Sequence, residues 1–233
     1  MENGRARRMI SKALTGNALL RLPGFLLLTQ MMTACVSGRV EEFLTVQPIL
    51  VGDEAVVILT NRQDAVVEAE RDFSSCIYSE LTRNNSDLNI ISENTFKDAI
   101  FPWFEPRLAP NKPDNLPILL ENEGVAQKVR NLKVRYLVWI HGESEVLNKQ
   151  GMMTCTLSPA GGGCLGVLSW DNSSNYEASI WDLQERQSLG VISSEASGTS
   201  MVPALGLPIP LIARTKTASC KGLASRLRTA LAG

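Results

Sequence analysis

The stretch Ala55-Val56-Val57-Ile58-Leu59-Thr60 decides the fold of this chain of 233 residues. Its apolar residues follow one another without the alternation of a half-exposed strand, which predicts a strand covered on both faces. The later stretch Val134-Arg135-Tyr136-Leu137-Val138-Trp139-Ile140 has the same near-continuous apolar character. Two such strands need cover on both sides of one sheet, so we expect a single α/β (α+β) domain with a mixed β-sheet and helices packed on it.

Two long segments have apolar residues at helical spacing. They are 65–83, whose apolar stripe includes Cys76, and 211–231, whose stripe includes Cys220. We expect these two helices to lie together on one face of the sheet. The shorter expected elements are a strand at 88–91, a helix at 92–101 and one or two helices within 114–131.

The pattern after residue 150 predicts an antiparallel meander of short strands. The expected strands are 152–156, 164–170, 176–183 and 188–197, joined by polar turns that include 171–175 and 184–187. Residues 202–210 contain three prolines and are expected to form an extended connector. No long paired amphipathic hairpins of the kind that a pore would need are expected.

Four cysteines follow Cys35, and none of them lies in a CxxC pair or a Cys/His cluster with the spacing of a zinc site. An even number of cysteines in an exported chain favours disulfides. We expect Cys155 to pair with Cys164 across a short turn, and Cys76 to pair with Cys220 if their helices pack side by side. The alternative for the second pair is two buried free thiols.

The first 34 residues have the plan of a bacterial secretory signal, with five basic residues before the apolar run Phe25-Leu26-Leu27-Leu28. The apolar region is shorter than the roughly 20 residues of a transmembrane helix. The ending Met32-Thr33-Ala34-Cys35 resembles a lipobox, which implies that Cys35 carries acyl chains such as palmitate. We therefore expect a lipoprotein signal peptide at 1–34, a lipidated tether at 35–52 and one domain at 53–233.

The composition excludes several classes of protein. From Cys35 onward the chain carries a net charge of −5, because five of its 23 basic and one of its 24 acidic residues precede this position. Such a protein lacks the broad basic surface of nucleic-acid binders. His141 is the only histidine, which rules out a multi-histidine metal site. We expect no metal and no cofactor.

The stretch His141-Gly142-Glu143-Ser144-Glu145 follows a central strand, where α/β folds often place functional groups. A hydrolase could use His141 as a general base, oriented by Glu143 or Glu145. However, the Gly-x-Ser-x-Gly motif of the α/β-hydrolases is absent around Ser144, and the polar end of a strand explains the same residues. The sequence therefore favours a protein that is not an enzyme.

The segment Phe101–Pro113 contains four prolines, which exclude a regular helix or a central strand. Its aromatic residues Trp103 and Phe104 either cap the core, which is the simpler explanation, or form a partner-binding surface. Trp181 is a third candidate for partner binding, because the alternation in 176–183 places it on the more exposed face of that strand.

In the order of its elements the chain resembles the bacterial envelope lipoproteins grouped around the curli-secretion channel lipoprotein. The resemblance lies in the lipobox, the strand Ala55–Thr60 leading to a helix, the strand Val134–His141, the hairpin Glu177–Glu195 with Ser179-Ile180-Trp181-Asp182-Leu183, and a closing helix. It implies a lipid-anchored outer-membrane protein whose periplasmic domain binds or supports another envelope protein or cell-wall material. The alternative function is an envelope hydrolase.

Overall fold

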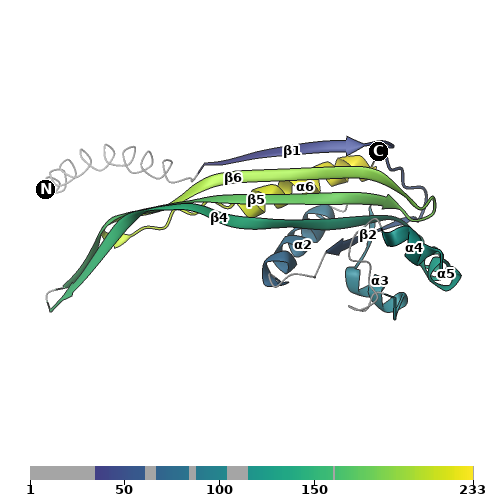
Figure 1. Ribbon diagram of the computed structural model, residues 1–233, viewed down its shortest axis with the longest axis horizontal. Coiled ribbons are helices and arrows are strands. Elements are labelled where there is room, and N and C mark those ends of the chain that lie inside the picture. The colour runs from purple at the N-terminus through teal and green to yellow at the C-terminus, as the bar shows by residue number, and fades with distance from the viewer. Residues whose placement is uncertain (1–34, 61–66, 84–87, 104–114, 160, 233) are drawn as a thin grey trace, which may run out of the picture. The chain divides into compact units, whose positions relative to one another are not determined.

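The computed structural model describes residues 35–60, 67–83, 88–103, 115–159 and 161–232, and the expected signal peptide at 1–34 lies outside them. Residues from Cys35 onward form one unit. Its elements, shown in Figure 1, are β1 (Val36–Leu44), β2 (Ala55–Thr60), α2 (Val67–Leu81), β3 (Asn89–Ile91), α3 (Glu93–Ala99), α4 (Leu116–Leu120), α5 (Glu123–Asn131), β4 (Val134–Ser158), β5 (Gly161–Asp182), β6 (Gln187–Pro208) and α6 (Thr215–Ala232).

The described strands form one mixed sheet in the order β1-β6-β5-β4-β2-β3. β2 pairs in parallel with both β3 and β4, whereas the other neighbouring strands are antiparallel. β2 is thus an inner strand, and its residues from Ala55 to Leu59 are buried. The mixed α/β (α+β) sheet expected from the two apolar stretches is confirmed.

Different helices cover the two faces of the sheet. On one face α2 and α6 pack together, and Ile77 of α2 and Leu223 of α6 share a buried cluster with Val138 of β4. This confirms the expectation that the two longest helices lie on the same face. On the other face α3, α4 and α5 pack over a second cluster that includes Trp139. In Figure 1 the strands β4 and β5 extend beyond these helices, so the sheet has a covered body and an uncovered end.

β1 corrects the expectation of a tether at 35–52. Residues Val36 to Leu44 pair antiparallel with β6 and form one edge of the sheet. Neighbouring Glu41 and Glu42 disturb the alternation of the segment, so its sequence does not indicate a strand. Its place is set instead by distant contacts, which include the ladder to β6 and an ion pair between Arg226 of α6 and Glu42.

β4, β5 and β6 are much longer than the expected strands, with 25, 22 and 22 residues. The polar stretch 171–175, expected to be a turn, lies within β5 and pairs with both neighbours. Asn172 of this stretch donates to Ser200 Oγ of β6, and Ser174 Oγ lies 2.9 Å from Oγ1 of Thr215 in α6 in a hydrogen bond. The expected absence of long hairpins is therefore wrong. The expected connector at 202–210 is also wrong, because most of it belongs to β6.

Two disulfides join the same cysteines that the sequence pairs. Cys76 of α2 is bonded to Cys220 of α6, with Cα atoms 6.4 Å apart across 144 residues of sequence. Cys155 and Cys164, only nine residues apart, are direct neighbours on β4 and β5 with Cα atoms 4.0 Å apart. The first bond therefore ties two helices over the core, and the second closes the far end of a hairpin.

Removing the long disulfide should cost the body more stability than removing the short one. In the chain-entropy model the bond Cys76–Cys220 contributes up to about 5 kcal/mol, and Cys155–Cys164 up to about 3 kcal/mol. We expect the paired alanine variant at Cys76 and Cys220 to show the larger drop in unfolding free energy in a guanidinium titration monitored by far-UV circular dichroism. The paired variant at Cys155 and Cys164 is the control. Equal losses in the two variants would contradict the assignment of the long bond to the core.

Candidate functional site

The residues of the alternative hydrolase hypothesis, His141 with Glu143 or Glu145, do not assemble into a site. The His141 side chain is half exposed, and its Nε2 lies 3.7 Å from Glu177 Oε1 on β5, whereas no contact in the described part of the chain joins it to Glu143 or Glu145. Ser144 Oγ instead bonds with Ser174 Oγ at 2.8 Å. The adjacent cavity measures about 10 Å³, which is room for about one water molecule. In the described structure, the cavity beside His141 therefore has no room for a substrate.

The three aromatic candidates for partner binding also lie differently from the expectation. Trp181 is buried in the cluster under α3, α4 and α5, and Trp103 packs against the same cluster from its edge. Phe104 lies outside the described residues. The expectation that Trp181 lies on an exposed face is wrong, because the helices that cover this end of the sheet were not visible in the alternation of the strand. Trp103 fits the simpler explanation of an aromatic residue that caps the core.

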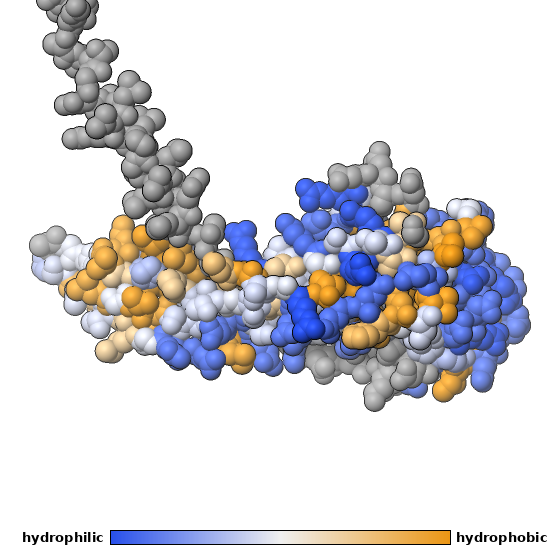
Figure 2. Space-filling model, turned by 90° about the horizontal axis from the view of Figure 1, so that it is seen from above, coloured by the Kyte–Doolittle hydropathy of each residue, from blue (hydrophilic) through white to orange (hydrophobic). Residues whose placement is uncertain are grey.

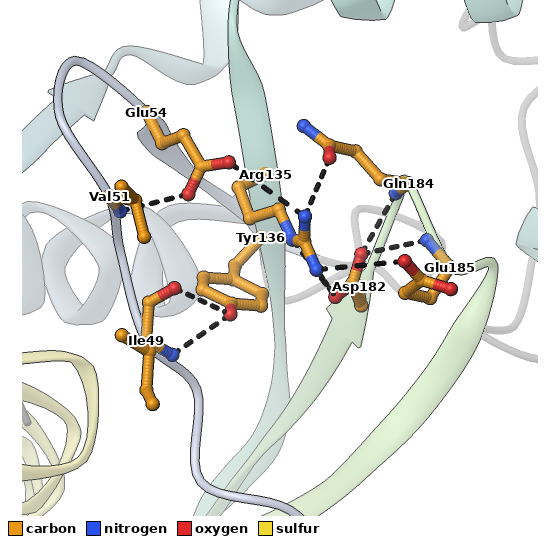
Figure 3. Close-up of polar contacts among 8 residues, drawn as sticks. All are labelled: Ile49, Val51, Glu54, Arg135, Tyr136, Asp182, Gln184 and Glu185. Atoms are coloured by element: carbon orange, nitrogen blue, oxygen red, sulfur yellow. Dashed lines mark hydrogen bonds and ion pairs between the residues drawn. The ribbon is translucent and has the colours of Figure 1, made fainter.

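A polar cluster at the start of β4 is centred on Arg135, which lies within ion-pair distance of Glu54, Asp182 and Glu185 (Figure 3). Arg135 donates from Nε and Nη2 to Asp182 Oδ2, at 3.0 and 2.7 Å. Asp182 Oδ1 accepts the backbone N–H groups of Gln184 and Glu185, both at 2.9 Å, and so closes the turn between β5 and β6. Burial would lower the pKa of Arg135, but the hydrogen bonds and the charge of Asp182 outweigh it and raise that pKa.

The same cluster ties the segment after β1 to the sheet. Tyr136 donates its hydroxyl to the Ile49 carbonyl and accepts from the Ile49 N–H, both at 2.9 Å. Glu54 lies 3.8 Å from Arg135 Nη1 and accepts the Val51 N–H at 3.0 Å. Every charge in Figure 3 thus has a structural partner. We assign the cluster to stability rather than to catalysis.

Asp182→Ala should destabilise the protein, because it leaves the charge of Arg135 partly buried without its partner. Breaking a buried ion pair by removing one member costs about 3 to 5 kcal/mol, and we expect a loss near the lower end because Arg135 keeps 21% of its side chain exposed. Glu185→Ala is the matched control, since its carboxylate is 63% exposed and 4.0 Å from Arg135. A thermal unfolding series measures both variants, and similar losses would contradict the assigned role of Asp182.

The feature that sequence reasoning missed is an extension of the sheet without any charge. Residues 150–170 and 199–213 contain no Asp, Glu, Lys or Arg. They form the ends of β4, β5 and β6 together with the segment after β6, and we call them the arm. In Figure 1 the arm is the tapering end of the long strands, beyond the helices. The sequence feature that could have indicated the arm is the lack of charged residues over these two stretches. The short strands, turns and connector expected there gave no reason to consider the two stretches together.

Large apolar side chains are exposed on both faces of the arm. Direct cross-strand partners put Met152, Val167 and Pro203 in one row, and Thr154, Leu165 and Leu205 in the next row of the same face. Leu157 lies on the opposite face, because successive side chains of a strand alternate. The exposed fractions reach 76% for Met152, 92% for Leu205 and 94% for Leu157. Figure 2 shows hydrophobic surface gathered at the end of the molecule that the arm forms, on the face seen in that view.

A bulge marks the root of the arm. Leu147 pairs with Asp171 and Gln150 pairs with Ser169, so Asn148 and Lys149 together oppose the single residue Trp170. An extra residue of this kind bends a strand and re-aims its side chains. Gly151 makes the geometry possible, because its φ is +94° and a Cβ there would lie only 2.1 Å from the Val167 carbonyl oxygen.

Asp171 joins the three strands at this root. Its carboxylate accepts Thr199 Oγ1 from β6 at 2.7 Å and Asn148 Nδ2 from β4 at 3.1 Å. These hydrogen bonds, from Thr199 first and Asn148 second, lower the pKa of Asp171. Asp171 is therefore charged at neutral pH, and on β5 it marks the boundary between the charged body and the uncharged arm.

Cys35, the expected site of lipidation, lies beside the same root. It is exposed and is not in a disulfide. Its carbonyl oxygen lies so close to Gly198 of β6 that a Cβ at this glycine would be 2.8 Å from it. Gly198 precedes Thr199, the first residue of the arm on β6. The structure therefore brings the expected lipid attachment residue and the apolar arm together at one end of the sheet.

Other classes of site find no support in the described part of the chain. Its His, Cys, Asp and Glu residues form no group of three that could hold a metal ion. None of its helices has both the length and the apolar character needed to span a membrane.

Comparisons with known proteins give only distant structural likenesses. No protein-family model and no curated protein sequence matches the chain significantly. The chain is similar to the dodecamer of a PelC point variant from Paraburkholderia phytofirmans, with 15% identity and a TM-score of 0.40 over 84% of this chain and 100% of that chain. The chain is also similar to a PelC dodecamer from this organism in another crystal form, with 12% identity and a TM-score of 0.36 over 84% of this chain and 98% of that chain. A third similar structure is that of the hypothetical protein CT253 from Chlamydia trachomatis, with 12% identity and a TM-score of 0.34 over 76% of this chain and 97% of that chain.

Proposed function

We propose that this protein is a non-enzymatic, lipid-anchored component of the bacterial outer membrane that inserts its arm into the membrane. Its body then remains on the periplasmic side and supports the assembly of another envelope component. The observation that supports this function is the arm, an uncharged extension of the sheet with exposed apolar side chains on both faces. Contiguous exposed apolar surfaces of this kind mark contacts with proteins or membranes.

The dimensions of the arm suit a membrane. The residues of β4 from Gln150 to Ser158 extend about 30 Å at about 3.4 Å per residue. The hydrocarbon core of a bilayer is also about 30 Å thick. A partner protein with one apolar groove would explain exposure on one face of the arm, whereas lipid around the arm explains Leu205 on one face and Leu157 on the other.

The arm has an open strand edge, which a second copy of the chain could pair with. Beyond Ile140, the last residue of β4 that pairs with β2, the described part of β4 has a partner on only one side. Backbone N–H and C=O groups on an open edge cannot remain unpaired in hydrocarbon, where each costs several kcal/mol. We therefore propose that the arms of neighbouring copies pair along their edges when they enter the membrane.

Replacing apolar residues of the arm should release the protein from membranes once its lipid is removed. In a Cys35→Ser background we expect the otherwise unchanged chain to stay with membranes after an alkaline carbonate wash. Adding Leu165→Asn and Leu205→Asn should make it soluble, because burying each leucine contributes about 2 kcal/mol. Fractionation and immunoblotting measure the distribution.

Phe43→Asn in the same background is the matched control. Phe43 is 63% exposed on β1 of the body, nearly the same as the 66% of Leu165. The control should therefore remain with membranes. If the Cys35→Ser protein with an intact arm is already fully soluble, the proposed role of the arm is wrong.

After extraction in a mild detergent, the protein–detergent complex should contain several copies of the chain. Size-exclusion chromatography with light scattering gives the protein mass of the detergent complex, and we expect a multiple of the mass of one chain. The arm variant with Leu165→Asn and Leu205→Asn should run as a smaller species, because its arm no longer enters the detergent belt. A single copy in the unchanged complex would contradict pairing between arms.

A further inference from the structure

The positive charges nearest to the arm in the sequence, those of Lys149 and Arg214, lie at its root. Lys149 lies in the bulge opposite Trp170, and Trp170 pairs with Ser200 of β6. Ser200 Oγ accepts the backbone N–H of Ala213 at 2.9 Å, and Arg214 is the next residue. Lys149 and Trp170 therefore lie at one level of the arm. Arg214 lies slightly nearer the body, because the Cβ of Ala213 is 3.0 Å from the position that a Cβ at Gly198 would take. The three residues come from three separate parts of the sequence.

The two cations are available to an external anion. Both Lys149 and Arg214 are exposed, and neither makes an ion pair with another residue of the described chain. The carboxylate at this level, that of Asp171, is occupied by Thr199 and Asn148. Asp171 reduces the local charge but does not neutralise both cations.

A groove beside Lys149 has the chemistry of a lipid site. It has a volume of about 470 Å³, and its lining includes Lys149, Trp170, Val146 and Leu168. Trp residues favour the interface between water and hydrocarbon, where one part of the ring is apolar and the N–H remains near polar groups. The lysine suits a phosphate, and the apolar side chains suit the first part of an acyl chain.

We propose that the root of the arm binds the phosphate headgroup of an anionic phospholipid through Lys149 and Arg214, with the lipid seated in the groove against Trp170. This inference rests on the proposed function, because it places the root at the membrane surface when the arm is inserted. Cys35 lies at the same root, so its acyl chains would enter the membrane at the same level. The occupant is a lipid rather than a soluble phosphate, because the groove opens at the boundary of the apolar arm.

The test uses the full chain purified from membranes in a neutral detergent. Binding of fluorescent phosphatidylglycerol and fluorescent phosphatidylcholine in mixed micelles is measured for the unchanged protein, Lys149→Gln, Arg214→Gln and the double variant. A Lys or Arg near an anionic lipid surface contributes about 1 kcal/mol, which corresponds to about a fivefold change in affinity. We expect each single variant to bind phosphatidylglycerol about fivefold more weakly and the double variant about 25-fold more weakly, with phosphatidylcholine binding unchanged.

Arg186→Asn provides the control for loss of a positive charge. Arg186 is exposed in the turn between β5 and β6, at the other end of these strands, and its φ of 54° is a conformation that Asn tolerates. An equal loss with this control, or unchanged binding in the double variant, overturns the inference. Competition by soluble glycerol phosphate as effective as that by the lipid would also overturn it, by showing a site for free phosphate.

The outcomes separate this inference from the proposed function. Unchanged lipid selectivity in the double variant, together with release of the Leu165 and Leu205 variant from membranes, refutes the headgroup site and keeps the inserted arm. Failure of the fractionation experiment refutes the inserted arm itself, whatever Lys149 and Arg214 bind.

Discussion

The hydrogen-bond ladder between β4 and β5 is the constraint on which the rest of the structure depends. It runs from Tyr136 opposite Asp182 to Ser158 opposite Gly161, with one irregularity at the bulge. Because side chains alternate between the faces of a strand, the register that buries Val138 and Ile180 also decides which residues the arm exposes. A shift by one residue would move the core residues of the body to the opposite face and would rearrange the apolar surface of the arm at the same time.

The structure fixes this register at both ends by different means. At the body end, the carboxylate of Asp182 accepts two backbone N–H groups of the turn and holds Arg135 of the neighbouring strand. Near the tip, the disulfide between Cys155 and Cys164 joins directly opposed residues. The tip has no covering helix and no buried side chains comparable to those of the body, within the part of the chain that the structure describes. A covalent bond is therefore the effective constraint where burial is absent.

The sequence predicts those parts of the fold in which burial imposes a regular pattern. The apolar run of β2, the first part of β4 and the helical spacing of Cys76 and Cys220 all reflect a covered core, and the expected pairing of α2 with α6 follows from them. The polar stretch 171–175 misleads, because its residues Asn172 and Ser174 are satisfied by partners on β4, β6 and α6 that are distant in sequence. β1 is hidden for a similar reason, since β6 determines its pairing.

The candidate site was missed because its signal is an absence rather than a motif. His141 and the carboxylates near it attract attention as possible catalysts, yet the strand simply passes from the core to a polar, uncovered face at this point. Trp181 was expected to be exposed, because the alternation of its strand does not show that α3, α4 and α5 cover that face of the sheet. The uncharged stretches 150–170 and 199–213 become meaningful only when the pairing of β4, β5 and β6 brings them together.

The change of composition along the long strands also limits how deeply the arm can enter a membrane. Moving from the tip toward the body, the first charged residues are Lys149 on β4, Asp171 on β5 and Arg214 after β6, and Glu145 and Glu143 follow on an exposed face. Transferring such charges into hydrocarbon is costly, so the insertion that we propose would stop at the root of the arm. The expected lipid site Cys35 lies at this same root, whereas the Arg135 cluster lies at the opposite end of the strands. One set of strands thus defines an apolar end, a boundary and a polar body, and in the proposed inserted state the body would be directed away from the membrane.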